Sequence, residues 1–203
     1  MGAELPPAVA EAFGDPPTLP TARLVLRRFR PEDAEDIFAY ASDPQMTTWV
    51  PWEAHRSLDD SRAFVERVLQ KYRERREAEW VITLRPGGRV IGTIRLGQYH
   101  PVHRRADLGY AVGRAWWGQG YATEAARAVV AFGFSRLDLN RIWAICDLGN
   151  VASERVMQKV GMRFEGVLRE HMYEKGQFRD VKLYAILRRD WRPDVGSPVP
   201  TGA

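Results

Sequence analysis

Two glycines, Gly118 and Gly120, stand just before a run of helix-forming residues that begins at Tyr121. Glycine adopts positive φ angles without strain, and it lets a ligand approach the main chain where a Cβ would block it. The first amides of a helix have no acceptor inside the helix, and the helix dipole places about half a positive charge beside them. A strand, a glycine turn and a helix in this order are therefore typical of a phosphate-binding site.

Two common nucleotide-binding motifs do not fit this turn. A P-loop requires Lys and then Ser or Thr after the second glycine, where Tyr121 and Ala122 stand instead. A dinucleotide fingerprint requires Gly or Ala three positions after the second glycine, where Thr123 stands. Taken alone, the glycines fit a tight strand-to-helix turn as well as they fit a phosphate site.

A second polar segment, "NVASERVMQKVG", follows about thirty residues later and opens with Asn150 and Ser153. Together with "DLGYAVGRAWWGQGYATEA", it resembles the GNAT superfamily of acetyl-CoA-dependent N-acyltransferases. The segments "TARLVLR" (residues 21–27) and "PEDAEDIFAYASDP" are similar to the ribosomal-protein N-terminal-alanine acetyltransferase branch of that superfamily. The likeness covers residues 21–187, which is nearly the whole body of the chain.

The resemblance implies a place for each part of the cofactor acetyl-CoA. It implies that the pyrophosphate lies on the glycine turn and that the main chain of the preceding strand binds the pantetheine arm. An amide near Val112 would then polarise the thioester carbonyl and stabilise the oxyanion. The expected cofactor-binding residues are Tyr110, Ala111, Val112, Gly118, Gln119, Gly120, Tyr121, Ala122, Thr123 and Asn150.

The implied reaction is direct attack by a primary amine on the thioester. A base must remove a proton from the amine, and an acid can give one to the departing thiolate. The resemblance implies that Ser153 approaches the sulfur, so we expect it to be the acid. The structural alternative is that Asn150 is a favourable N-cap and Ser153 fits the first turn of the helix. Glu170 and His171 are the expected catalytic residues for the base, with Asp107 as a third candidate. A surface position is the more common explanation for a histidine on a strand such as His171.

Two side chains near the turn depart from the superfamily pattern Gln/Arg-x-x-Gly-x-Gly/Ala. Ala115 occupies its first position, and Trp117 stands where arginine is often found. Arg114 or Arg155 could supply the missing positive charge. Cys146, the one cysteine, lies within the apolar "IWAICDL", so we expect a buried, unreactive thiol rather than a nucleophile.

The acceptor is the least determined part of the function. Trp49 and Trp52, in the proline-broken segment "TTWVPWEAH", are the expected substrate-binding residues, although aromatic residues there could also be core. Glu174 and Asp180 could attract a cationic amine. We expect an N-acetyltransferase acting on a protein N-terminal α-amino group. The alternatives are a small amine (a polyamine, amino acid or aminoglycoside) and a non-catalytic acyl-CoA-binding module.

These residues must be positioned by elements that the hydrophobic pattern predicts. Strands are expected at residues 22–30, where apolar residues alternate, and at 79–85, 89–100 and 105–113. A hairpin turn is expected at 86–88, and "NRIWAICDL" is expected to be a strand buried on both faces. Helical spacing is expected at 31–43, 57–77, 120–137 and 150–161, followed by two long strands around residues 175–177. The predicted fold class is an α/β (α+β) sandwich with a mixed, mostly antiparallel seven-stranded sheet and four flanking helices.

Composition favours a single cytoplasmic domain. The 203 residues carry a formal net charge of +4 in mixed rather than blocked charges, so nucleic acid is an improbable partner. No apolar run reaches the roughly 20 residues that cross a bilayer, and we expect no membrane partner, no metal site and a monomer or homodimer. The acetyltransferase domain is expected at residues 21–191, between flexible, proline-containing ends at 1–20 and 192–203.

Overall fold

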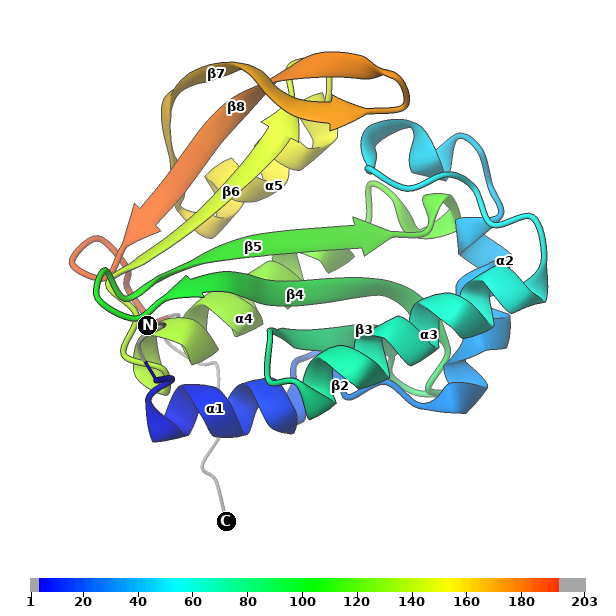
Figure 1. The fold of residues 1–203 in the computed structure, drawn as a ribbon, viewed down its shortest axis with the longest axis horizontal. Helices are drawn as coiled ribbons and strands as arrows, with labels where there is room; N and C mark the ends of the chain where they lie inside the picture. Colours follow the sequence, from blue (N-terminus) through cyan, green and yellow to red (C-terminus); the bar gives the residue numbers. More distant parts are fainter. Residues whose placement is uncertain (1–3, 194–203) are drawn as a thin grey trace.

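A computed structural model of the chain describes residues 4–193, and it shows one eight-stranded sheet covered by helices (Figure 1). The strands lie in the order β1-β2-β3-β4-β5-β6-β8-β7. Among the strands of residues 4–193, only β5 and β6 are parallel neighbours. The strands are β1 (Leu19–Pro20), β2 (Leu24–Arg27), β3 (Ala78–Leu84), β4 (Val90–His100), β5 (Arg105–Val112), β6 (Arg141–Asp147), β7 (Arg163–Glu174) and β8 (Gln177–Leu187).

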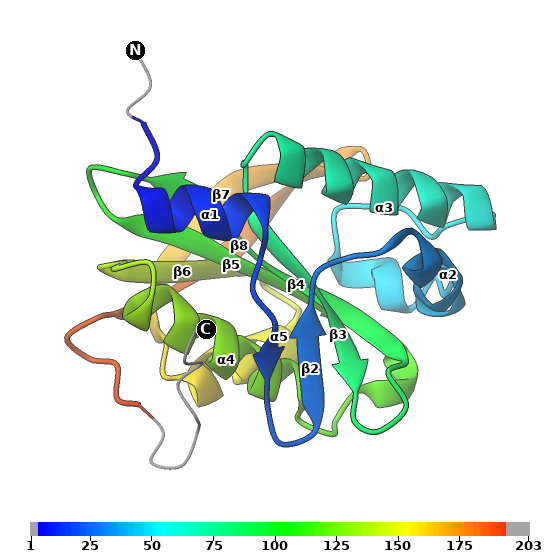
Figure 2. The same ribbon diagram turned by 90° about the horizontal axis from the view of Figure 1, so that it is seen from below.

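Helices cover both faces of this sheet, with α2 and α3 on one face and α4 and α5 on the other (Figure 2). The α-helices are α1 (Pro7–Gly14), α2 (Ala34–Ala41), α3 (Leu58–Arg73), α4 (Tyr121–Ser135) and α5 (Val151–Val160), and short 3-10 turns are η1 (Pro31–Asp33), η2 (Met46–Trp49) and η3 (Arg114–Trp116). The predicted mixed, mostly antiparallel architecture is confirmed. The described residues contain one strand and one helix more than the seven strands and four helices expected.

The additional strand and helix come from the N-terminal segment, which we expected to be a flexible extension. Residues 7–14 instead form α1, whose Val9, Ala12 and Phe13 are buried in the core. The indole Nε1 of Trp80 donates to the carbonyl of Pro17 (2.7 Å) and fastens the link between α1 and β1. Apolar residues every three or four positions explain this packing, and Pro7 is compatible with the first turn of a helix. Of the predicted C-terminal extension, residues 194–203 lie outside the described part.

Apolar periodicity predicts the core correctly on most elements. Leu24 and Leu26 of β2 are fully buried while Val25 is half-buried, so the predicted alternation is confirmed. The predicted stripe on α3 supplies Val65, Val68 and Tyr72 to the core. The helical spacing expected at residues 120–137 is confirmed by α4, which buries Ala125, Ala126, Val129, Val130 and Phe132.

The expectation for β6 was wrong. Burial along this strand alternates: Ile142, Ala144 and Cys146 are buried, whereas Trp143 and Ile145 are only partly covered. The continuous apolar run misled the prediction because the second face of β6 is apolar and yet lines an open cavity rather than the core.

Strands β5 and β6 separate along their length, and this separation creates the site. They pair only from Arg105–Asp107 to Arg141–Trp143, and beyond these residues the two strands diverge (Figure 1). The divergence leaves one edge of residues 108–112 without a strand partner. On its other edge β5 stays paired with β4 up to Val112 and Gly92.

Candidate active site

The register of β5 shows which main-chain groups face the opening. Gly113 donates its N–H to the carbonyl of Ile91 (2.8 Å), so odd-numbered residues of β5 point their main-chain groups toward β4. In an antiparallel pair the alternate residues point the other way. The N–H and C=O groups of Tyr110 and Val112 therefore point into the gap between β5 and β6. This agrees with the expectation that Val112 presents its amide to a ligand.

The glycine turn has the backbone geometry of an anion cradle. Gly118 and Gly120 have φ angles of +75° and +82°, and a Cβ built on Gly118 would meet no atom within 4 Å. Gly120 is the N-cap of α4, and helical bonding begins when Glu124 N–H donates to its carbonyl (3.0 Å). Among the described residues, the amides of 121–123 meet no main-chain acceptor and no capping side chain. These free amides fit a phosphate.

Residues from the start of the domain brace this turn. Glu124 accepts hydrogen bonds from Thr21 Oγ1 (2.7 Å), Arg23 N (2.8 Å) and Arg23 Nε (2.7 Å). Arg23 Nη1 also donates to the carbonyl of Gln119 (3.0 Å), and its guanidinium stacks 4.6 Å from the centre of the Tyr121 ring. Partial burial raises the pKa of Glu124, but the bonds from Thr21 and Arg23 outweigh burial and hold it below its usual value. The "TARL" segment therefore contributes to the site.

One large cavity, of about 810 Å³, runs from the glycine turn through the gap to the loops around η2. It gathers most of the residues singled out from the sequence. Of the expected catalytic, cofactor-binding and substrate-binding residues, those that line it are Trp49, Trp52, Tyr110, Ala111, Val112, Gly118, Gly120, Tyr121, Ala122, Thr123, Asn150, Ser153 and His171; it is also lined by Asp107, Trp117, Cys146, Arg155 and Glu174. Gln119 and Glu170 do not line it: Gln119 faces Arg23, and Glu170 is exposed, with its amide donating to Asp180 Oδ1 (2.8 Å).

Two hydroxyl groups meet at the middle of the cavity. The Tyr110 hydroxyl lies 2.9 Å from Ser153 Oγ and 3.1 Å from the Ser153 carbonyl, which joins β5 to α5 across the gap. Burial raises the pKa of Tyr110, so this hydroxyl keeps its proton. Asn150 caps α5, since its Oδ1 accepts from Ser153 N–H (3.0 Å). The capping role therefore belongs to Asn150, and the Ser153 hydroxyl is free for contact with Tyr110.

A network of charged side chains lies on the face that β3, β4 and β5 turn toward α3. Arg95 binds Asp107 with both terminal nitrogens (3.0 and 2.6 Å) and also contacts Glu77 (3.1 Å). Lys71 of α3 pairs with Glu77 and with Glu79 (3.3 Å). Burial raises the pKa of Glu79 and of Asp107, although the neighbouring Lys71 and Arg95 act in the opposite direction.

This network was missed from the sequence, apart from Asp107. Its members come from four elements, and their spacing along the chain contains no motif. The antiparallel register places Glu79 opposite Arg95, and it places Asp107 on β5 two residues from Gly109, which lies opposite Arg95. Of the five members, all but Glu77 line the cavity. Asp107 pairs with Arg95 of the neighbouring strand and not with Arg104 or Arg105, its near neighbours in the sequence.

Two loops close over the other end of the cavity. The ring of Trp49 lies so close to Gly149 that a Cβ there would come within 2.8 Å of it. Lys175, at the tip of the β7–β8 hairpin, donates to the carbonyl of Thr47 (2.6 Å). Trp52 lies beside His55, with 5.4 Å between ring centres, and both rings line the cavity. Trp49 and Trp52 thus lie where a substrate-lining role was expected.

Comparison with known proteins identifies the chain. The family described as acetyltransferase (GNAT) domain matches residues 23–163. This chain belongs to the GNAT acetyltransferase family. It is 37% identical over 172 residues to the uncharacterised N-acetyltransferase YoaA of Bacillus subtilis, covering 85% of this chain and 97% of YoaA.

Two further relatives extend this result. The chain is 26% identical over 189 residues to the spermidine N(1)-acetyltransferase of Escherichia coli, covering 90% of this chain and 96% of that protein. The structure of Mycobacterium smegmatis RimJ in complex with CoA-disulfide superposes with a TM-score of 0.77 at 27% identity, covering 86% of this chain and 88% of RimJ. This acetyltransferase is therefore an N-acetyltransferase that uses acetyl-CoA. Within the described part, no helix is long and apolar enough to cross a membrane.

Two arginines, Arg114 and Arg155, were expected as sources of positive charge beside the glycine turn of the acetyltransferase. Arg114 is committed elsewhere, because its Nε binds Asp43 Oδ2 (2.5 Å). Arg155 and Lys159, one helical turn apart on α5, both line the cavity. Neither side chain has an ion-pair partner among the described residues. Of the two cations expected from the sequence, Arg155 is the one available to a phosphate.

The candidate bases of the acetyltransferase differ in position. Glu170 lies outside the cavity, and Asp107 is occupied by Arg95. His171 lines the cavity from β7. A second imidazole that we did not predict, His55, lies 2.7 Å from Ser61 Oγ, and burial lowers its pKa. His171 is thus the member of the predicted pair that the fold places at the site.

Cys146 differs in its surroundings from the two hydroxyl groups of Tyr110 and Ser153. It is buried at 7% exposure, although one side of it borders the cavity. Burial raises the pKa of its thiol to about 11. A thiol with this pKa is almost fully protonated at neutral pH, so Cys146 is a poor nucleophile.

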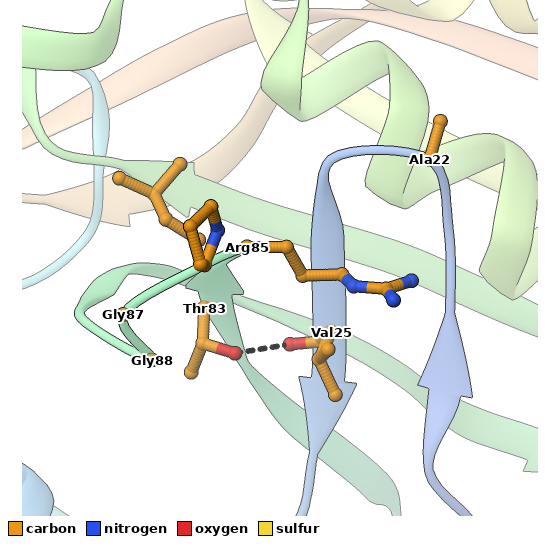
Figure 3. A pocket seen from close by; sticks show the side chains of 8 residues that line it. Ala22, Val25, Thr83, Arg85, Gly87 and Gly88 are labelled. Carbon is orange, nitrogen blue, oxygen red and sulfur yellow. Dashed lines mark hydrogen bonds between the residues drawn. The ribbon is translucent and has the colours of Figure 1, made fainter.

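A second hollow, shown in Figure 3, lies between β2 and the turn that joins β3 to β4. Thr83 Oγ1 donates to the carbonyl of Val25 within it (2.8 Å). Arg85 is the one charged residue that lines it, and this side chain donates to the carbonyl of Thr21 (3.0 Å). Its lining therefore offers no pair of groups for acid–base chemistry.

Proposed function

We propose that this acetyltransferase acetylates the α-amino group at a protein N-terminus. One observation carries this choice: the buried carboxylates of the cavity, Glu79 and Asp107, are both held by cations. An α-amino group with a pKa near 7.8 is about 15% neutral at pH 7, whereas an alkylamine with a pKa near 10.4 is only about 0.04% neutral. A site without a free buried carboxylate is better suited to the amine that is already partly neutral.

The cofactor side of the cavity would hold acetyl-CoA along the main chain. When bound, acetyl-CoA supplies an acetyl group activated as a thioester. The free amides of residues 121–123 would bind its pyrophosphate, with Arg155 adding a charge that the superfamily pattern takes from another position. The main chain of Tyr110 would bind the pantetheine, as an added strand would. The amide of Val112 would stabilise the oxyanion that forms on attack.

Proton transfer would be divided between two parts of the cavity. Ser153 Oγ would give its proton to the departing sulfur, and the Tyr110 hydroxyl, 2.9 Å away, would replace it. On the acceptor side, His171 would take the proton that the amine loses, directly or through a water molecule. Trp49 and Trp52 would line the path of the substrate. The role of Glu170 as a base is not part of this mechanism, because Glu170 lies outside the cavity.

The acceptor is tested by turnover assays on three matched substrates at pH 7: a peptide with a free N-terminus, the same peptide with a blocked N-terminus and one lysine, and spermidine. We expect kcat/KM to be at least tenfold higher for the free N-terminus, because of the difference in the neutral fraction. Faster turnover of spermidine would replace this proposal with the small-amine alternative. Faster turnover of the blocked peptide would assign the enzyme to lysine side chains.

A further inference from the structure

The two adjacent tryptophans before the glycine turn have different environments. Trp116 packs between the two core clusters, and its ring lies so close to Gly113 that a Cβ there would come within 2.8 Å. Trp117 is 45% exposed and lines the cavity. An exposed indole that borders the cofactor groove does not owe its position to burial. A specific contact must therefore hold it there.

That contact is a hydrogen bond to the strand that carries the expected oxyanion amide. Trp117 Nε1 donates to the carbonyl of Val112 (2.6 Å), one of the main-chain groups that point into the gap between β5 and β6. The opposite end of the same peptide group is also bound, because Gly113 N–H donates to Ile91 O (2.8 Å). The Val112–Gly113 peptide is thus fixed at both ends, although β5 has lost its partner strand on this side.

The bond also changes the electrostatics of the gap. The N–H and C=O of Val112 point to the same side of β5, so an uncovered carbonyl would present negative charge close to a forming oxyanion. An indole N–H that donates to this carbonyl points the positive end of its dipole at the oxygen and so reduces the negative potential there. Preorganised dipoles of this kind stabilise a transition state without reorganisation during the reaction. No other side chain donates to this carbonyl among the described residues.

We propose that Trp117 is a positioning residue for acyl transfer: its indole N–H binds the Val112 carbonyl and thereby orients the Val112 amide toward the thioester. This inference rests on the proposed role of that amide as the oxyanion donor. It also gives a reason for a tryptophan at a position where the superfamily often has arginine. The residue acts on the strand rather than on the phosphate.

The decisive experiment compares Trp117→Gln with Trp117→Met. Both substitutions remove the ring, and both side chains have similar length, but only glutamine carries an N–H donor, at the same number of bonds from Cα as indole Nε1. We expect Trp117→Met to lower kcat about tenfold and Trp117→Gln to lower it no more than about threefold, with CoA affinity by calorimetry alike in both. Equal kcat values for the two variants would overturn the proposal.

A second measurement does not depend on the acceptor. The amide ¹⁵N shift of Gly113 responds to hydrogen bonding at the Val112 carbonyl, so we expect it to move in Trp117→Met and to stay near the native value in Trp117→Gln. An unmoved shift in both variants would also overturn the proposal. Trp191→Phe, which alters an indole packed against Phe134 far from the cavity, is the control for loss of a tryptophan.

The outcome can be separated from the choice of acceptor. If wild-type enzyme does not acetylate peptide N-termini, the N-terminal proposal fails, and the kcat ratio of the two Trp117 variants is measured on the amine that is turned over. If wild type is active on peptides and the two variants are equal in kcat and in ¹⁵N shift, the role of Trp117 fails alone.

Discussion

The two halves of the cavity are lined by different kinds of chemical group. The half that we propose to hold the cofactor, called the cofactor half, is made of main-chain groups: the amides that follow Gly120 and the free edge of β5. The half that we propose to hold the amine, called the acceptor half, is made of side chains, with the Lys71–Glu79–Arg95–Asp107 network on one wall and aromatic rings from the η2 region on another. Main-chain sites depend on local conformation, whereas side-chain sites depend on pairs of distant residues. Mutations should therefore affect the two halves differently.

The largest expected effect is on the cofactor half. In Gly120→Val, a β-branched residue would have to adopt φ near +82°, which costs about 1–3 kcal/mol, and its side chain would crowd the cradle. We expect CoA affinity, measured by calorimetry, to fall at least about a hundredfold because the cradle changes shape. Gly87→Val is the matched control, since Gly87 also has a positive φ (+105°) but lies in the β3–β4 turn. If both variants keep native affinity, the phosphate site lies elsewhere.

Removal of a positively charged side chain from the acceptor half should lower the free energy of unfolding. In Arg95→Ala, Asp107 and Glu77 would lose their shared partner while remaining mostly buried. We expect the free energy of unfolding, measured with urea, to fall by about 2–3 kcal/mol. CoA affinity of the folded protein should stay within about twofold, since no main-chain group of the cradle moves. A large loss of CoA affinity would show that the two halves are coupled. Arg189→Ala is the control, since Arg189 is exposed and has no ion pair with any residue in the described part of the chain.

Ser153→Ala tests the junction between the halves. If Ser153 supplies the proton to the leaving thiolate, kcat should fall about tenfold to a hundredfold while CoA affinity changes little. The melting temperature should remain nearly native, because the helix cap is made by Asn150 and not by the Ser153 hydroxyl. A lower melting temperature with unchanged kcat would assign Ser153 a structural role.

The acceptor half should also respond to pH. Burial raises the pKa of Glu79, so the folded protein binds this proton more tightly than the unfolded chain. The resulting stabilisation is present at low pH and is lost as pH rises from about 4.3 through the raised pKa, with a slope of at most about 1.4 kcal/mol per pH unit. Glu79→Gln should remove this contribution, which urea titrations from pH 4 to 8 would detect. An unchanged pH dependence would mean that Glu79 does not hold the proton.

The smallest expected effect is at Cys146. Cys146→Ala should keep kcat within about twofold, since a thiol with a pKa of about 11 is not the nucleophile. The substitution should instead lower the free energy of unfolding by about 1 kcal/mol, because loss of the buried thiol leaves a small cavity. The comparison is made by parallel assays of turnover and thermal unfolding. A loss of activity of a hundredfold or more would reopen covalent catalysis.

The difference between main-chain sites and side-chain sites also explains what could be predicted from the sequence. The glycine turn, the cap at Asn150 and the strand before the turn were predicted correctly as structural elements because their signals are local: glycine, capping residues and apolar patterning within a few positions. The charged network was missed because its partners meet only through strand register. The N-terminal helix was missed because prolines before residue 20 suggested disorder, although Pro7 stands at a helix start.

One segment of the chain could be recognised from the sequence by its family resemblance, but its physical role could not be explained. The segment at Thr21 to Leu24 carried a family resemblance with no physical role attached to it. The structure supplies the role, since Thr21 and Arg23 both bind Glu124 beside the glycine turn. No periodicity links residues so far apart. The resemblance therefore marked an interaction that the composition of the segment did not reveal.

That brace has a consequence for how the protein is made. Arg23 and Glu124 are 101 positions apart, so the beginning of the domain leaves the ribosome long before its partner. Until α4 has been synthesised and docked, Arg23 and Thr21 have no Glu124 to bind, and the turn at Gly120 is unsupported. Competence to bind the cofactor is therefore acquired late in synthesis, and a chain that binds CoA tightly has already joined the connection between β1 and β2 to α4.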